Sequence, residues 1–89
     1  MTSKTTRAFR DLLARLPKSV QTEARDAYRM FVREPFHSGL QFKQVIKDPP
    51  VWSVRIGLHH RALGVRRPYG IAWFWIGTHA EYDHILRRL

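Results

Sequence analysis

The sequence predicts an α+β fold: an N-terminal helical hairpin packed on a small, mainly antiparallel four-stranded sheet, followed by a short C-terminal helix. Two patterns lead to this prediction. Apolar residues recur at helical spacing up to about residue 34, and after residue 40 β-branched and aromatic runs are separated by proline and glycine turns. A chain of 89 residues with 44% apolar residues has room for one core, so residues 1–89 are expected to form a single domain.

The first helix is expected to begin at Thr5 or Thr6 and to end at Leu16, because the residue before Pro17 is pushed out of the helical region. Its apolar positions have helical spacing: Phe9, Leu12, Leu13 and Leu16. A second helix is expected from near Ser19 to Glu34. Its predicted apolar positions are Val20, Ala24, Ala27, Tyr28, Phe31 and Val32. Residues 1–7 could add an edge strand before the first helix, but their alternation is too polar to decide.

Four strands are expected after the helices, at residues 40–47, 51–58, 60–67 and 71–76. The proline-rich stretch 48–50 and the stretch 68–70, Pro-Tyr-Gly, are turn signals between them. We expect the last three strands to form an antiparallel meander, with the two helices on one face. Residues 73–76 are apolar almost without alternation, which predicts a central strand buried on both faces.

Side chains of a strand point alternately to the two faces of a sheet, which sorts the residues of 51–58. The core face is predicted to carry Trp52, Val54, Ile56 and Leu58. The opposite face is predicted to carry Ser53, Arg55 and Gly57. Strict counting along 60–67 puts Arg61 with Leu63 and Val65, so either a bulge intervenes or the guanidinium reaches out at the end of the sheet.

A short terminal helix is expected over residues 80–88, because Thr78 can act as its N-cap and Glu81 then completes a capping box. Gly77 lets the chain leave the sheet tightly. His79 is therefore held at the end of the last strand. Its imidazole could carry out chemistry or could only support the helix cap, and the sequence leaves both readings open.

The chain is strongly basic, with 16 Lys and Arg against seven Asp and Glu and a formal net charge of +9. Such a charge indicates an anionic partner: nucleic acid, an anionic membrane surface or an acidic protein. The basic residues do not segregate onto one amphipathic helix, so we do not expect a membrane partner. The absence of cysteine, of an apolar run of membrane-spanning length and of a secretory h-region is typical of a cytoplasmic protein.

Several classes of site are not expected. The five histidines lack the paired spacing of metal ligands, and the chain has neither a glycine-rich phosphate loop nor a serine or cysteine nucleophile motif. We therefore predict no metal and no cofactor.

The groups that remain suit RNA cleavage. When a base takes the proton of the ribose 2′-hydroxyl, that oxygen attacks the adjacent phosphate, an acid protonates the leaving 5′-oxygen, and cations stabilise the charge on the phosphoryl oxygens. Lys43, Arg55 and Arg61 could bind the phosphate, and His79 could act as acid or base. Taken singly, Lys43 and Arg55 could equally be solvated surface residues.

The order of several short motifs resembles the RelE/ParE superfamily of bacterial type II toxins, in its plasmid-stabilisation or translational-repressor subgroup. The stretches FRDLLARLP and VQTEARDAYRMF resemble its helical hairpin, and LQFKQV resembles its first central strand. WSVRIGLHHRAL and IAWFWIGTHAEYD resemble its hairpin and its closing strand with the terminal motif. The resemblance covers nearly the whole chain and is fairly specific to the superfamily, but less so to an activity.

The resemblance implies a toxin that cuts mRNA on the ribosome without a metal. It implies four catalytic candidates, Lys43, Arg55, Arg61 and His79, with Tyr82 or Asp83 nearby as support. The predicted nucleic-acid-binding set is Lys43, Lys47, Arg55, His60, Arg61 and Tyr82. The expected partners are an acidic antitoxin, the ribosome and mRNA.

Two alternatives stay open. Relatives with this fold poison DNA gyrase without any nuclease site, and the basic face could instead serve only to bind an antitoxin. A nuclease requires that the imidazole of His79 lie on the same side of the sheet as Arg55.

Overall fold

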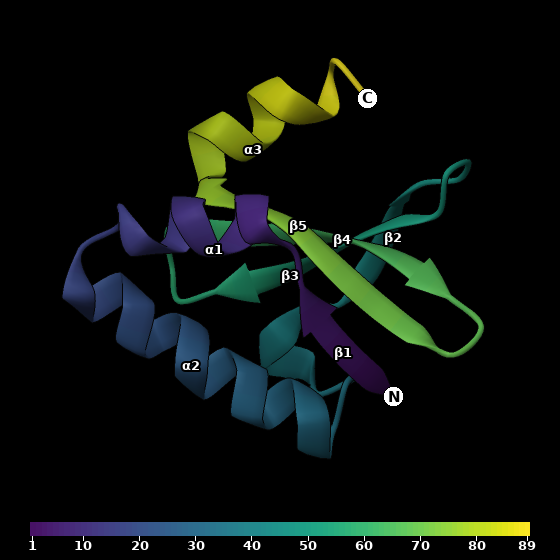
Figure 1. Cartoon of the computed structure of the whole chain (residues 1–89), viewed down its shortest axis with the longest axis horizontal. Coiled ribbons are helices and arrows are strands. Elements are labelled where there is room, and N and C mark those ends of the chain that lie inside the picture. The colour runs from purple at the N-terminus through teal and green to yellow at the C-terminus, as the bar shows by residue number, and fades with distance from the viewer.

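The computed structural model describes residues 1–89 and shows three α-helices around one sheet (Figure 1). In chain order its elements are β1 (Thr2–Thr5), α1 (Arg7–Ala14), α2 (Lys18–Arg33), the 3-10 turn η1 (Ser38–Leu40), β2 (Lys43–Ile46), β3 (Val51–Ile56), β4 (His60–Arg67), β5 (Gly70–Thr78) and α3 (His79–Leu86). The predicted helical hairpin, meander and C-terminal helix are therefore all present. No helix combines the length and the apolar character that crossing a bilayer requires.

The sheet has five strands in the order β1-β5-β4-β3-β2, so the prediction of four was wrong. Strands β2 to β5 form the antiparallel meander. The fifth strand is β1, which pairs in parallel with β5. It is held by polar contacts, because the Trp73 indole N–H donates to the Ser3 hydroxyl at 2.9 Å and the Thr6 N–H donates to the Trp73 carbonyl at 2.9 Å. These contacts explain how so polar a segment joins the sheet.

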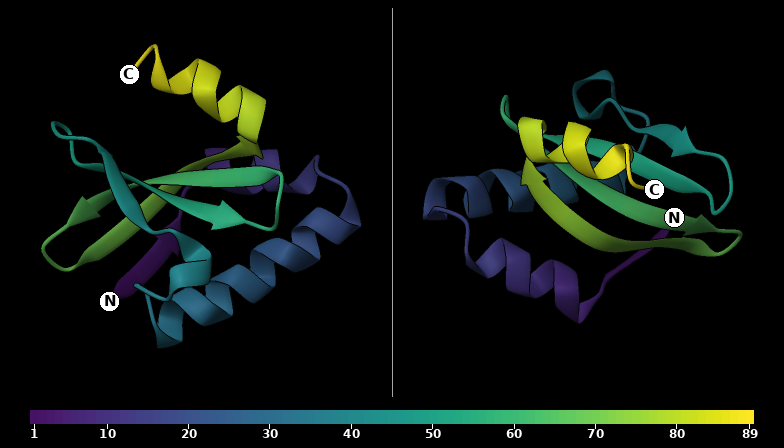
Figure 2. Two further views of the ribbon diagram at one scale, coloured as in Figure 1. Left: turned by 180° about the vertical axis from the view of Figure 1, so that it is seen from behind. Right: turned by 90° about the horizontal axis from the view of Figure 1, so that it is seen from above.

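Helices α1 and α2 cover one face of the sheet, as the two views of Figure 2 show. Their apolar positions form the main core with residues of β3, β4 and β5, and Phe31 of α2 lies at its centre with 2% exposure. The Phe31 ring meets the rings of Phe42 and Trp73 edge to face, at 5.0 and 5.4 Å between centroids. We call this side of the sheet the helical-hairpin face.

The opposite face is covered by α3, and we call it the α3 face. A second apolar cluster lies there, built on Val51, Leu63 and Tyr82. Strand β5 contributes to both sides: Trp73 and Ile76 belong to the main core, while Phe74 and Trp75 pack against the second cluster. The prediction that this strand is buried on both faces is therefore confirmed for the helical-hairpin face and only in part for the α3 face, where Phe74 and Trp75 are half-buried.

Three apolar positions differ from the prediction. Leu58 is 70% exposed, because Gly57, at φ +59°, ends β3 and turns the chain before Leu58 can join the core. Tyr28 and Val32 of α2 are 45% and 52% exposed, since this helix buries a narrower stripe than its apolar spacing suggests. Ser53 is 1% exposed, because α3 covers its face of the sheet.

Two of the three helices, α1 and α3, have a side-chain cap at their start. The Thr6 hydroxyl accepts from the Phe9 N–H at 3.2 Å at the start of α1. At α3 the complete capping box forms, with the Glu81 N–H donating to the Thr78 hydroxyl at 3.1 Å and the Thr78 N–H donating to the Glu81 carboxylate at 2.8 Å. Hydrogen bonds from Thr78 hold the pKa of Glu81 below its usual range.

We predict that Thr78→Ala lowers the free energy of unfolding by about 1 kcal/mol, because it removes the hydroxyl that caps α3.

Glu81→Gln should destabilise the protein at pH 6 more than at pH 3. A carboxylate whose pKa is lower in the folded state stabilises above the unfolded pKa of about 4.3, and that stabilisation is lost as the pH falls through the folded value. Urea unfolding at the two pH values measures both effects. An equal destabilisation by Glu81→Gln at pH 6 and pH 3 would contradict the second prediction.

Candidate functional site

Strands β3 and β4 place Arg55 directly opposite Arg61 in their antiparallel register. Both side chains lie on the α3 face, because Arg55 alternates with Ser53, which lies under Tyr82 of α3. The prediction that Arg61 shares a face with Leu63 and Val65 also holds: the register shift between β4 and β5 falls after Leu63, beyond Arg61. The sheet therefore places the two arginines at opposite positions on one face, without a bulge between them.

Neither guanidinium has a carboxylate partner. Arg55 donates from Nε to the Gly57 carbonyl at 2.9 Å, and Arg61 donates from Nη1 to the carbonyl of His60 at 3.0 Å. The ion pairs of the structure lie elsewhere, at Arg7–Asp11, Asp26–Arg29 and His79–Asp83. Like charges directly opposite each other destabilise a sheet, so an anion bound between these arginines would relieve an existing cost.

The whole sheet has the same charge bias. Its strands contain no Asp or Glu, and their charged residues are Lys4, Lys43, Arg55, Arg61, Arg66 and Arg67. Lys43 of β2 pairs with Ser53 and therefore belongs to the α3 face, where it is exposed at the sheet edge. Lys47 is exposed in the turn that follows β2. Lys43 thus lies on the same face as the two arginines, two strands away from Arg61.

His79 is the first residue of α3, which covers this same face. Its side chain is 51% exposed, and Nδ1 lies 3.3 Å from Oδ2 of Asp83, one turn further along the helix. The N-cap bonds are made by Thr78, so the imidazole of His79 has no capping role. A carboxylate at Nδ1 orients the ring and leaves Nε2 to meet a ligand. We call Arg55, Arg61, His79 and Asp83, with Lys43 at its edge, the basic site.

Three residues of the predicted nucleic-acid-binding set lie outside the basic site: Lys47, in the turn after β2, Tyr82 and His60. Tyr82 is 6% exposed, and its hydroxyl donates to the Ser53 hydroxyl at 3.2 Å. Its ring lies 5.8 Å from the imidazole of His79, so it fixes the helix on which His79 sits. His60 alternates with Arg61 and has the same orientation as Ala62 of the main core, which places it on the helical-hairpin face.

Sequence reasoning missed the role of Ser53. The signal was its position in strict alternation between Val51 and Arg55, which made it the natural contact for anything that packs on the α3 face. Only the fold shows that a helix from the end of the chain supplies that contact.

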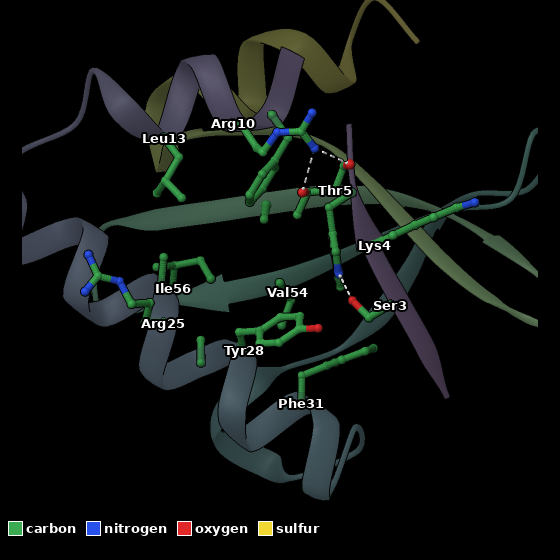
Figure 3. Close-up of a pocket in the computed structure, with 15 residues that line it drawn as sticks. Ser3, Lys4, Thr5, Arg10, Leu13, Arg25, Tyr28, Phe31, Val54 and Ile56 are labelled. Carbon is green, nitrogen blue, oxygen red and sulfur yellow. Dashed lines mark hydrogen bonds between the residues drawn. The ribbon is translucent and has the colours of Figure 1, made fainter. Parts of the chain in front are cut away.

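A cavity of about 510 Å³ lies on the other side of the sheet, between α1, β1 and α2 (Figure 3). Its walls are mainly apolar, and Lys4, Arg10 and Arg25 are the charged residues that line it. No histidine and no carboxylate is among its lining residues. This cavity is therefore separate from the basic site. No group of three or more His, Asp or Glu side chains is placed to hold a metal ion.

Comparison with known proteins gives one finding. A family model described as a ParE-like toxin domain matches residues 18–84, which run from the start of α2 into α3. No curated protein and no solved structure matches the chain.

The buried hydroxyl pair makes a prediction about stability. Tyr82→Phe should lower the free energy of unfolding by about 1–3 kcal/mol, because it leaves the Ser53 hydroxyl buried without a partner. Adding Ser53→Ala to Tyr82→Phe should restore part of that loss. A double-mutant cycle in urea measures the coupling. Strictly additive effects of the two substitutions would show that the hydroxyls do not interact.

Proposed function

Because this chain belongs to the family of ParE-like toxins and is a toxin of a toxin–antitoxin system, we propose that it inhibits translation by cutting mRNA on the ribosome. A toxin of this kind has an antitoxin partner, and the net charge of +9 favours an acidic one. The proposed reaction needs no metal and no cofactor. The partners that we propose for the reaction itself are the ribosome and mRNA.

The observation that carries this proposal is the pair Arg55 and Arg61, which occupy opposite positions of two neighbouring strands on one face and take part in no ion pair. The side-chain hydrogen bonds of both arginines go to backbone carbonyls, so their remaining N–H donors can bind a phosphate. Helix α3, which covers this face of the sheet, begins with His79.

Each side chain of the basic site can then have its own role in the proposed cleavage. Arg55 and Arg61 bind the two non-bridging oxygens of the scissile phosphate and stabilise the charge that grows on them. Nε2 of His79 acts either on the 2′-hydroxyl proton as a base or on the leaving 5′-oxygen as an acid. Asp83 holds the ring in place through its contact with Nδ1. Lys43 contacts a neighbouring phosphate and adds to affinity, not to the chemical step.

We predict that His79→Ala lowers the rate of mRNA cleavage at least about 100-fold, the usual size of a general acid or base contribution. Arg55→Ala and Arg61→Ala should each cost about 100-fold, because each removes a donor to the phosphoryl oxygens. Asp83→Asn should cause a smaller loss. The measurement is primer extension on a defined message in a reconstituted translation system.

The matched control for the histidine is His84→Ala, which removes an exposed imidazole from the same helix. The control for the arginines is Arg7→Ala, whose side chain is 89% exposed on α1. Both controls should cut at the wild-type rate. Uncut message together with blocked DNA replication would support a gyrase poison, and full growth inhibition by His79→Ala and Arg55→Ala would support a non-catalytic binding module.

A further inference from the structure

Another arginine without an ion pair lies on the opposite side of the sheet. Arg66 of β4 is on the helical-hairpin face, where its guanidinium carbon lies 4.5 Å from the centroid of the Trp52 ring. It also lies 5.8 Å from the ring of Phe36 and 5.9 Å from that of Phe42. We call these four residues the Arg66 cluster.

The aromatic rings of the Arg66 cluster also contact one another. Phe42 lies 4.6 Å from Trp52 and 5.3 Å from Phe36 between ring centroids. Phe42 is buried, but Phe36 is 62% exposed in the linker between α2 and η1. Aromatic residues and arginine are enriched at the hot spots of protein interfaces, and here an exposed aromatic ring lies beside an arginine.

The contacts of Arg66 determine what it can still bind. Cation–π contacts occupy the face of its guanidinium, while its side chain takes part in no ion pair and donates no hydrogen bond to the protein. The N–H groups at the edge of the guanidinium therefore point to solvent or to a partner. The planar guanidinium of Arg66 can bind a carboxylate through two parallel hydrogen bonds. The surrounding rings lower the cost of removing water from the guanidinium.

We propose that the Arg66 cluster is a docking site for the antitoxin, which places a carboxylate on Arg66 and an adjacent apolar side chain on Phe36. The inference rests on the assignment of the chain as a toxin, which implies an antitoxin, and not on the proposed cleavage of RNA. Charge complementarity identifies the occupant, because the chain carries +9 and its strands have no acidic residue to neutralise Arg66.

Two observations favour a protein over RNA at this place. Arg66 already covers the Trp52 ring, so that ring is not open to stack a base. In addition, β2 is an edge strand directly after Phe42, and its outer backbone groups can pair with an extended peptide. The Arg66 cluster also lies on the opposite face from the basic site. An antitoxin bound to the Arg66 cluster therefore does not contact the phosphate-binding residues there.

The test measures antitoxin binding by isothermal titration, with the protein encoded beside the toxin as the probe. We expect Arg66→Ala to weaken the complex at least about tenfold, and Phe36→Ala to have an effect of similar size. Arg66→Lys should recover little of the affinity, because lysine keeps the charge but lacks the planar fork. Each variant is first shown to unfold at a temperature close to that of the wild type.

Two neighbouring residues provide matched controls. Arg67→Ala removes the same charge from the next position of β4, and Tyr69→Ala removes a ring that is 69% exposed in the next turn. Both should change antitoxin affinity less than about threefold. Equal losses for Arg66→Ala and Arg67→Ala would overturn the proposal, since only net charge would then matter. So would a variant at Arg66 that keeps antitoxin affinity but weakens binding to a single-stranded RNA oligonucleotide.

Discussion

The antiparallel register between β3 and β4 is the constraint on which the rest of the structure depends. It places Val54 and Ala62 together in the main core, and Ser53 opposite Leu63 under α3. The same register sets Arg55 against Arg61. A slip of one residue would send every one of these side chains to the wrong face, so burial on both faces fixes the position of the arginines. The basic site is thus a consequence of core packing, even though its own charges oppose it.

The two faces of the sheet differ in a way that separates two kinds of contact. The α3 face has a small apolar cluster, and its polar groups are tied to a helix by the Tyr82–Ser53 hydroxyl pair. The helical-hairpin face has the main core, the large cavity and the Arg66 cluster. In our proposals RNA binds the first face and the antitoxin the second. An antitoxin bound to the Arg66 cluster would then inhibit by preventing entry to the ribosome, not by filling the basic site.

The sequence predicted most elements, because proline and glycine mark the turns and because the period of the apolar residues changes from helical to strand spacing. It could not decide β1, whose pairing with β5 depends on backbone bonds and on one Ser3–Trp73 contact 70 residues apart. The prediction that Leu58 lies in the core was wrong, because the alternation of side chains does not show that the strand ends before Gly57. The grouping of Lys43, Arg55 and Arg61 on one face follows from strand alternation and pairing. The Arg66 cluster does not, because it joins a linker residue, Phe36, to β3 and β4.

The central claim is that the basic site promotes attack of a 2′-hydroxyl of the RNA on the adjacent phosphate. The chemistry of the cleaved ends tests this claim most directly. A message translated in a reconstituted system would be cut by the toxin, and the new ends analysed by mass spectrometry. The mechanism predicts a 2′,3′-cyclic phosphate and a 5′-hydroxyl, and no cleavage when the scissile nucleotide carries a 2′-O-methyl group. Ends with a 3′-hydroxyl and a 5′-phosphate, or cleavage that persists at the methylated nucleotide, would contradict it.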